Sequence, residues 1–248
     1  MSATRLDVLM VSRSLVATRE RARALILAGD VIVDGVPVTK AGTRIADTAT
    51  IELRQPDHPW VGRGGVKLSH ALGVFDLDVT GRIALDIGAS TGGFTDVLLA
   101  RGARRVVAVD VGTNQLDWKL RSDPRVLCLE RLNARYLAPA DLPDDARSFD
   151  VITIDVSFIS LSLVLPVVPA LLAQDGAVIA LVKPQFEAGR EEVGAGGIVR
   201  DPSVHTRVIE TVAASALQVG LTRLAVEPSP ITGTEGNREF LMLLARTT

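Results

Sequence analysis

A glycine-rich turn between an apolar run and a predicted helix constrains the fold of this chain more than any other feature. Residues 84–95 read ALDIGASTGGFT, in which an apolar run ends in an acid and a glycine turn follows. Glycines let the backbone approach a ligand, and a helix N-terminus offers free N–H donors. A second apolar run, 105–109, ends in Asp110, at about the 20-residue spacing of a carboxylate that binds a ribose in a βαβ nucleotide site. These residues predict a βαβ unit that binds an adenosine-like cofactor.

The spacing of the glycines separates two classes of cofactor. A dinucleotide fingerprint reads G-x-G-x-x-G, whereas this turn reads Gly88-x-x-x-Gly92-Gly93, which disfavours a dehydrogenase. The pattern D-x-G-x-x-x-G-G-F resembles instead the first motif of S-adenosylmethionine (SAM) methyltransferases, in which no pyrophosphate is cradled. The resemblance implies SAM as the cofactor, and an ordinary tight strand–helix turn is the alternative.

Composition excludes several other classes of protein. With 248 residues, a net charge of -2 and 47% hydrophobic residues, the chain can bury the cores of one large or two smaller domains. One cysteine, Cys128, implies no disulfide framework and fits a reducing cytoplasm. Residues 1–5 lack an apolar signal segment, and the apolar stretch 161–173 contains two prolines and is shorter than the roughly 20 residues of a membrane span. We expect a cytoplasmic protein without membrane insertion or a metal site.

The first 54 residues have a pattern of their own. Two short helices are predicted, the second between an N-cap at Thr18 and a C-cap at Gly29. A hairpin turn at Asp34-Gly35 follows, and residues 44–53 predict one further strand. The helices and hairpin, with the spacing A-x-x-L-I-x-x-G-x-V-x-V-D-G, resemble the S4 RNA-binding domain over residues 4–54.

Arginines outnumber acidic residues over residues 1–29. A local basic patch can hold a phosphate backbone although the whole chain is slightly acidic. In S4 domains the second helix carries basic side chains to RNA phosphates, and a solvated helix face is the alternative. The candidate RNA-binding residues are Arg5, Arg13, Arg19, Arg21, Arg23 and, beyond the linker, Arg63.

Two prolines and polar residues break all periodicity around residues 54–61. We therefore predict an S4-like domain over 1–54, a linker over 55–62 and a catalytic domain over 63–248. Trp60 is unusual in a spacer, because a bulky aromatic ring packs on a surface. Either it fixes the relative pose of the two domains or it covers an edge of the catalytic domain.

Beyond the linker, strands and helices alternate. Strands are expected near 82–87, 105–110, 125–130, 149–155, 176–183, 221–228 and 239–246, and helices near 65–74, 93–101, 115–121, 160–174 and 202–219. The alternation implies a parallel sheet covered on both faces, and the last two strands, which have no helix between them, form an antiparallel edge pair. The expected fold class is α/β: a Rossmann-like SAM methyltransferase domain with a mostly parallel sheet and an antiparallel last strand, after a small α+β S4 domain.

Ionisable residues stand at strand ends, where ligands bind in open α/β sheets. Asp155 follows the apolar strand 151–154, and Lys183 follows the apolar strand 177–182. A lysine there is hard to explain by core packing, and a charge that reaches solvent is the alternative. Lys67 near a helix start and Glu239 at the start of the last strand complete four catalytic candidates.

The order Lys67, Asp155, Lys183, Glu239 resembles the K-D-K-E tetrad of 2′-O-ribose methyltransferases of the FtsJ type. Together with the S4 domain and the segments IDVSFIS (154–160) and LVKPQFE (181–187), it makes nearly the whole chain similar to the TlyA family of ribosomal RNA cytidine 2′-O-methyltransferases, also called haemolysins. The resemblance implies that Lys183 is the general base. It also implies that Asp155 and Glu239 orient the lysines, while Lys67 holds the ribose or stabilises the developing charge.

Cofactor contacts follow from the same resemblance. Gly88, Ser90 and Gly92 would frame the methionine end of SAM. Asp110 would bind the ribose hydroxyls, and Asn133 would approach the adenine. Asp86 would either contact the cofactor or only order the loop. The glycine-rich segment 189–197 predicts a mobile loop that closes over RNA, with an inert surface excursion as the alternative.

Two departures from the family pattern affect the expected substrate. Pro59 precedes Trp60-Val61, where some relatives have a basic residue. We therefore do not expect a basic side chain here that couples RNA binding to SAM binding. The chain stops soon after the last strand, which favours large-subunit rRNA as the substrate. The alternatives are methylation of both subunits or of another RNA, a non-catalytic RNA-binding protein and, less favoured, a membrane-active haemolysin. The partner is ribosomal RNA or a ribosomal subunit; the oligomeric state is open, with a monomer favoured.

Overall fold

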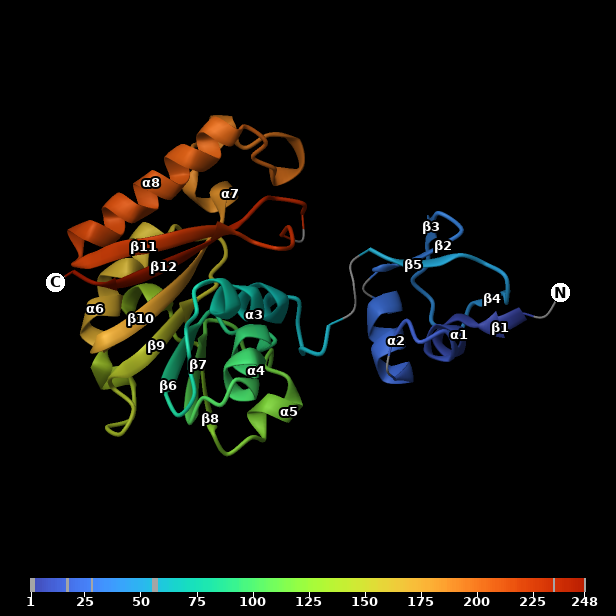
Figure 1. The fold of residues 1–248 in the computed structure, drawn as a ribbon, viewed down its shortest axis with the longest axis horizontal. Coiled ribbons are helices and arrows are strands. Elements are labelled where there is room, and N and C mark those ends of the chain that lie inside the picture. The colour runs from blue at the N-terminus through green and yellow to red at the C-terminus, as the bar shows by residue number, and fades with distance from the viewer. Residues whose placement is uncertain (1–2, 17, 28, 55–57, 234, 248) are drawn as a thin grey trace. The chain divides into compact units, whose positions relative to one another are not determined.

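The computed structural model describes residues 3–16, 18–27, 29–54, 58–233 and 235–247. The chain divides into two compact units, Met1–Pro59 and Trp60–Thr248, drawn in Figure 1. The domain limits predicted from the sequence, with a linker over 55–62, stay a prediction, because residues 55–57 lie outside the described part.

The first unit is a small α+β fold. Its elements are β1 (Ala3–Arg5), α1 (Leu6–Ser12), α2 (Arg19–Leu27), β2 (Val31–Val33), β3 (Val36–Pro37), β4 (Arg44–Ala46) and β5 (Ile51–Leu53). β1 pairs with β4, and β2 lies between β3 and β5, with all pairs antiparallel. Apolar side chains of both helices pack on β2 and β5 in one core that includes Leu6, Met10, Ile26 and Val31.

The turn signals read from the sequence of this unit are confirmed. Thr18 Oγ1 accepts a hydrogen bond from the backbone N–H of Arg21 at 3.1 Å, as an N-cap does. Gly29 ends the helix with φ 76°. Asp34 and Gly35 have φ 48° and 80°, the positive angles that a two-residue hairpin turn requires.

The single strand predicted over 44–53 is wrong. The segment forms two strands, β4 and β5, that belong to different sheets. Between them the chain turns: Ala49 donates its N–H to the carbonyl of Ala46 at 2.9 Å, and Thr50 donates to Asp34 Oδ1 at 2.8 Å. Alternation of apolar residues continues on both sides of this turn, so the pattern does not reveal the break.

The second unit is an α/β fold. Its longer elements are α3 (Gly64–Val74), β6 (Ile83–Ile87), α4 (Gly93–Ala100), β7 (Arg105–Asp110), α5 (Trp118–Arg121), β8 (Val126–Glu130), β9 (Phe149–Ile154), α6 (Val168–Leu171), β10 (Leu172–Val182), α7 (Pro184–Glu187), α8 (Pro202–Gln218), β11 (Leu221–Pro228) and β12 (Phe240–Arg246). Short 3₁₀ turns are η1 (Ala134–Tyr136), η2 (Pro139–Asp141), η3 (Leu161–Leu163), η4 (Leu165–Val167), η5 (Arg190–Glu192) and η6 (Ala195–Gly197).

The seven strands of this unit form one sheet in the order β11-β12-β10-β9-β6-β7-β8. The strands from β10 to β8 are parallel to one another, and β12 is antiparallel to both of its neighbours. The expected fold class, including the antiparallel closing pair, is confirmed. β12 lies inside the sheet, between β10 and β11, so β11 forms the edge.

Helices cover both faces of this sheet (Figure 1). On one face Ala84 of β6 packs in a core with Leu68 of α3 and Leu98 of α4. On the other face Leu85 of β6 packs in a core with Val208 of α8. Because both faces are buried, the strands are almost continuously apolar, which is why the sequence predicts them well.

The helical stretch predicted near 160–174 is confirmed only in part. This segment forms η3, η4 and α6, and β10 begins at Leu172. Pro166 and Pro169 lack an N–H and disfavour a helical conformation in the residue before them, so the segment breaks into short turns. The described residues contain no helix long and apolar enough to cross a membrane.

Candidate active site

The four catalytic candidates meet beyond the carboxyl ends of β9 and β10. Lys67 comes from α3, Asp155 follows β9, Lys183 follows β10, and Glu239 directly precedes β12. All four line one cavity of about 430 Å³. The sequence placed these residues in four separate elements, and the sheet topology brings them together.

Each lysine is paired with an acid. Lys183 Nζ lies 2.5 Å from Asp155 Oδ1, and Lys67 Nζ lies 2.5 Å from Glu239 Oε2. Both lysines are 8% exposed and Glu239 is 3% exposed. Buried charges are tolerated when they are paired. Each lysine is balanced by one carboxylate, so the four side chains together carry no net charge. Such a site can bind a polar group and transfer a proton.

The glycine turn lies directly against this acid–lysine pair. Asp155 donates its N–H to the carbonyl of Ile87 at 2.9 Å, which brings its backbone beside the turn. Gly88 has φ 85°, and a Cβ at this position would overlap the backbone carbonyl of Asp155. Glycine is therefore required here by both backbone angle and space.

A smaller cavity of about 150 Å³ lies over the glycine turn. It is lined by Gly64, Gly88, Ala89, Ser90, Thr91, Gly93, Phe94, Asp155, Ser157 and Lys183. It shares Gly64, Asp155, Ser157 and Lys183 with the cavity of the four catalytic candidates. These residues fit the methionine end of SAM, because bare backbone and the start of α4 line one side while the acid–lysine pair lies at the opening to the other cavity.

Asp110 ties the glycine turn to the end of β7. Its Oδ2 accepts the backbone N–H of Ser90 at 2.8 Å, and its Oδ1 accepts that of Gly112 at 2.7 Å. Ser90 itself has φ 48°. Gly92 has φ 96°, and a Cβ there would overlap Leu120, so this glycine is needed for packing against α5. The cofactor contacts predicted for these residues stay predictions.

Asp86 is completely buried beneath the turn. Thr95 Oγ1 and Thr153 Oγ1 donate hydrogen bonds to its two carboxylate oxygens at 2.7 and 2.9 Å. Burial raises the pKa of Asp86 to about 6, although these hydrogen bonds act in the opposite direction. This geometry favours the loop-ordering alternative, and direct contact of Asp86 with the cofactor stays a prediction.

Asn133 lies at a third cavity, of about 800 Å³. Its Oδ1 accepts the N–H of Arg135 at 3.0 Å and caps η1. The lining residues are Asn133, Arg135, Tyr136, Phe158, Ile159, Ser160, Leu163, Phe186 and Arg190. Phe158 and Phe186, with ring centroids 5.1 Å apart, also line the cavity of the four catalytic candidates. The predicted approach of Asn133 to the adenine stays a prediction.

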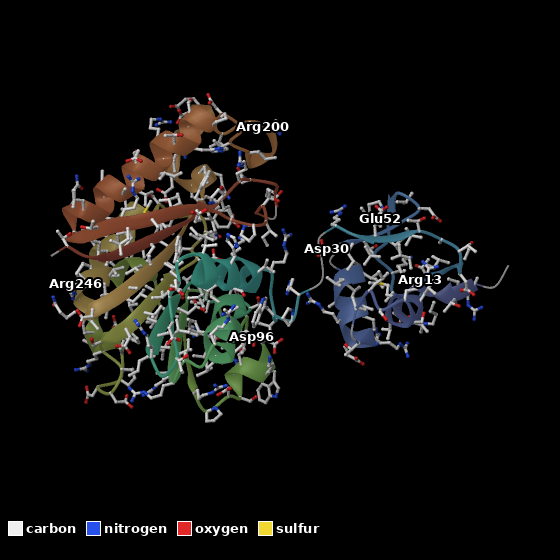
Figure 2. All side chains as sticks on the ribbon, viewed as in Figure 1. Arg13, Asp30, Glu52, Asp96, Arg200 and Arg246 are labelled. Atoms are coloured by element: carbon white, nitrogen blue, oxygen red, sulfur yellow. The ribbon has the colours of Figure 1, made fainter. Side chains whose placement is uncertain are left out.

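Three of the predicted RNA-binding arginines donate hydrogen bonds to carboxylate or backbone oxygens of the first unit. Arg5 and Arg19 each donate to the carboxylate of buried Asp7 at 2.9–3.0 Å. These guanidinium groups, Arg5 above all, hold the pKa of Asp7 well below its usual range. Arg13, labelled in Figure 2, donates to the backbone carbonyls of Ala49 and Asp47.

The other three predicted RNA-binding arginines are placed differently. Arg21 Nη2 lies 3.1 Å from His58 Nε2. Arg23 is exposed on α2. Arg63 belongs to the second unit, where it donates to the carbonyl of Thr232 at 3.1 Å and lines the cavity of the four catalytic candidates. RNA binding by these residues stays a prediction.

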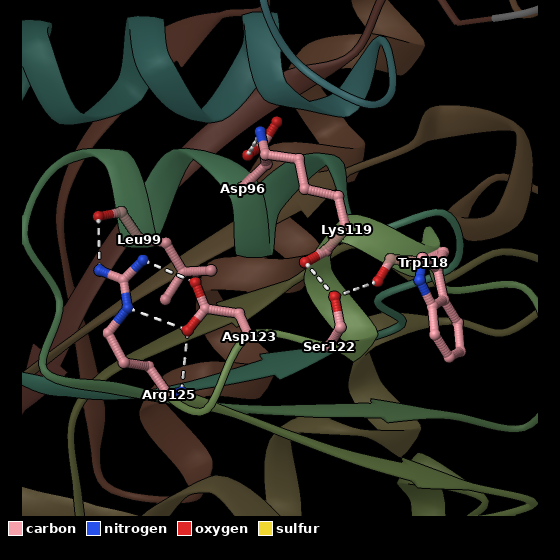
Figure 3. Close-up of polar contacts among 7 residues, drawn as sticks. All are labelled: Asp96, Leu99, Trp118, Lys119, Ser122, Asp123 and Arg125. Carbon is pink, nitrogen blue, oxygen red and sulfur yellow. Dashed lines mark hydrogen bonds and ion pairs between the residues drawn. The ribbon is translucent and has the colours of Figure 1, made fainter.

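Trp60 packs within the second unit. A Cβ at Gly65 would overlap the Trp60 ring, so the ring lies flush against the start of α3. The next residue, Val61, donates its N–H to Asp96 Oδ2 at 3.0 Å. Lys119 of α5 pairs with the other oxygen of Asp96 at 3.0 Å, as Figure 3 shows. These contacts support the alternative that Trp60 covers an edge of the catalytic unit.

The glycine-rich segment 189–197 joins the site through Asn237. This side chain is 1% exposed; it donates to the carbonyl of Gly197 at 2.8 Å and accepts the N–H of Val199 at 2.9 Å. Asn237 thus connects the C-terminal end of the segment to the turn before Glu239. Closure of this segment over RNA stays a prediction.

Ser157 and Glu187 are polar residues at or beside the site that the strand-end pattern does not predict. Ser157 Oγ accepts a hydrogen bond from Lys183 Nζ at 3.0 Å. Glu187 is largely buried and accepts from Ser160 Oγ at 2.6 Å and from the N–H of Leu161 at 2.7 Å; burial raises its pKa. Ser157 lies in the segment IDVSFIS and Glu187 in LVKPQFE. Neither residue directly follows a strand, so the position of strand ends does not indicate them.

Comparisons with known proteins show the family of both units. The FtsJ-like methyltransferase family matches residues 60–246, and the S4 domain family matches residues 4–51. The chain is 45% identical to the 16S/23S rRNA (cytidine-2′-O)-methyltransferase TlyA of Mycobacterium tuberculosis, over 98% of this chain and 90% of the relative. It is 32% identical to the 23S rRNA (cytidine-2′-O)-methyltransferase TlyA of Campylobacter jejuni, over 73% of this chain and 69% of the relative. A solved structure from Streptococcus thermophilus, described as a candidate hemolysin, is 48% identical with a TM-score of 0.78 and covers 100% of this chain and 90% of that one.

Proposed function

The chain belongs to the TlyA family, in which an S4 domain precedes an FtsJ-like SAM-dependent methyltransferase domain, and from this premise we propose that it methylates the 2′-hydroxyl of a cytidine in ribosomal RNA. One observation carries the proposal: the Lys183–Asp155 pair lines both the cavity over the glycine turn and the cavity of the four catalytic candidates. A methyl donor over the glycine turn and a ribose in the larger cavity would both reach this lysine.

SAM, when bound, supplies a methyl group whose bond to sulfur breaks as the ribose oxygen bonds to the methyl carbon. Gly88, Ser90 and Gly92 would hold its methionine end, and Asp110 its ribose. Asn133 would approach the adenine, and Asp86 would order the turn from below. The support for these assignments is the small cavity over the turn and the exclusion of any Cβ at Gly88.

Lys183 would act as the general base. A ribose hydroxyl is a poor nucleophile and must lose its proton during attack, so the neutral form of Lys183 takes this proton at Nζ. Asp155 orients the lysine through the 2.5 Å contact. Glu239 orients Lys67 in the same way at 2.5 Å, and Lys67 holds the ribose. Alignment of the reacting atoms within the site contributes much of the rate enhancement.

The substrate is expected to be the large-subunit RNA. Both relatives named above carry 23S rRNA in their names, and one also carries 16S rRNA. Methylation of both subunits is the alternative. Contacts with RNA phosphates would come from the arginines of the S4 domain and from Arg63, which lines the cavity of the four catalytic candidates. Action on ribosomal RNA would take place in the cytoplasm.

A methyl-transfer assay tests this proposal. Labelled SAM is incubated with large or small ribosomal subunits that lack the modification, together with wild-type protein or Lys183→Ala. We expect label on the ribose of one large-subunit cytidine, and a rate at least about 100-fold lower for Lys183→Ala, because general base catalysis contributes about 10²–10⁴-fold.

Other outcomes of this assay are informative. Label on both subunits would favour the broader specificity. An undiminished rate for Lys183→Ala would exclude this lysine as the base. Wild-type protein that binds SAM but transfers no label to either subunit would overturn the ribosomal substrate.

A further inference from the structure

Ser157 is a polar residue of the site to which the mechanism above gives no role. It lines both cavities, and its hydroxyl oxygen accepts a hydrogen bond from Lys183 Nζ at 3.0 Å. We propose that Ser157 is a positioning residue that aims the lone pair of Lys183 at the ribose hydroxyl. This inference rests on the proposed function of Lys183 as the base.

The coordination of Lys183 Nζ carries the argument. A neutral amine has two hydrogens and one lone pair in a tetrahedral arrangement around nitrogen. Ser157 Oγ at 3.0 Å accepts a hydrogen bond from Nζ, which fixes the direction of one hydrogen. The carboxylate of Asp155, whose Oδ1 lies 2.5 Å from Nζ as an ion pair without hydrogen-bond geometry, attracts the other. The lone pair then occupies the remaining direction, toward the space that Lys183 lines. With Asp155 alone, the amine would still rotate about its bond to Cε and would spend much of its time misdirected.

The backbone after Ser157 supports a positioning role. Phe158 has φ 63°, a conformation that a phenylalanine keeps only where the surroundings impose it. Three residues beyond Ser157 the loop is held by Glu187, whose carboxylate accepts from Ser160 and Leu161. The loop is thus fixed on both sides of a sharp turn that begins at Ser157.

The fold does not need the hydroxyl of Ser157 for packing. Ser157 is exposed to the cavity, and its hydroxyl group accepts the hydrogen bond from Lys183. Loss of this hydroxyl should therefore change the reaction more than the stability. An exposed position also accepts one additional methyl group, which allows two variants of equal shape to be compared.

The test compares Ser157→Thr with Ser157→Val in the full-length protein. Threonine keeps the hydroxyl, whereas valine has the same shape without it. Single-turnover methyl transfer to unmodified large subunits gives the rate constant, and the affinities for SAM and for subunits are measured separately. Ser162→Ala removes an exposed hydroxyl of the same segment and serves as the matched control.

We expect the rate constant of Ser157→Val to fall about 10- to 100-fold, the range that corresponds to one hydrogen bond to a charged or proton-transferring group. Ser157→Thr and Ser162→Ala should stay within about threefold of wild type, and both affinities should be unchanged in all variants. Equal rates for the valine and threonine variants would overturn the inference, as would a loss of SAM affinity that accounts for the slower valine variant. The proposed function fails in a different way, through inactive wild type or fully active Lys183→Ala.

Discussion

At the scale of single residues, buried acids of the second unit differ in how their charge is balanced. Glu239 has a lysine partner at 2.5 Å. Asp86 instead accepts hydrogen bonds from two threonine hydroxyls, and burial raises its pKa to about 6. The cofactor turn is therefore built over a carboxyl group whose neutral form is favoured more strongly in the folded than in the unfolded chain.

This preference makes the stability of the second unit dependent on pH. The folded pKa of Asp86 lies above the unfolded value, so its contribution is fully present below about pH 4 and is lost as pH rises through about 6. A pKa rise of this size corresponds to a loss of about 3 kcal/mol in the free energy of unfolding between pH 4 and pH 7. Asp86→Asn removes the titration, so the stability of the variant relative to wild type should increase over this interval. Denaturant unfolding at both pH values checks the prediction.

The exposed Asp175→Asn is the matched control, because it removes one carboxylate of the same unit without removing a buried charge. A difference in unfolding free energy between Asp86→Asn and wild type that is the same at pH 4 and pH 7 would contradict the prediction. Substitution of Thr153 by valine should raise the pKa of Asp86 further, because its hydroxyl group favours the ionised form.

At the scale of elements, the start of α3 and the start of α4 come into contact through glycines. A Cβ at Gly93 would lie 2.8 Å from the backbone N of Gly65 and 3.1 Å from the carbonyl of Gly62. The backbone here has no flexible side chain that can move aside. The positions of Lys67 on α3 and of the glycine turn before α4 therefore depend on each other.

Gly93→Ala should push the two helices apart. We expect a loss of about 1–3 kcal/mol in the free energy of unfolding, together with weaker SAM binding. Gly73→Ala, in α3 but with open space around its Cβ position, should be neutral or stabilise by about 0.5–1 kcal/mol, as alanine does in a helix interior. Calorimetric SAM titration and denaturant unfolding of both variants measure these effects. Equal stability of the two variants would contradict the proposed contact.

The sequence predicts an element well where buried apolar residues follow a regular pattern. It predicts poorly the side-chain contacts that depend on the conformation of a loop. The strand that ends at Asp155 and the strand that ends at Lys183 are apolar because helices cover both faces, so their ends, and with them the candidate base, could be located. The hydrogen bond of Ser157 with Lys183 lies in the loop after β9, where no apolar pattern indicates the direction of a side chain. Pro166 and Pro169 break the helical stretch predicted from apolar content, because neither residue can donate an N–H to a continuous helix.

At the scale of the whole molecule, basic side chains of the first unit and the catalytic side chains belong to separate compact units. Arg23→Gln on α2 should therefore weaken RNA binding and leave SAM affinity unchanged. If Arg23 contacts one phosphate, the slope of log affinity against log salt concentration should fall by about one. Filter binding to large subunits over a series of salt concentrations measures this slope. The neighbouring Glu20→Gln, which removes an acid from the same helix, should not weaken binding, and an unchanged slope for Arg23→Gln would place the RNA elsewhere.

The internal position of β12 has a consequence for the order in which the protein is made. Phe240–Arg246 pairs with β10 on one side and with β11 on the other, so neither strand gains this partner until the ribosome has synthesised the chain through Arg246. During translation the nascent chain would expose the apolar edge of β10 to solvent and to other chains. The ion pair of Glu239 with Lys67 needs the residue directly before β12, so the same stretch of chain completes both the sheet and the catalytic set.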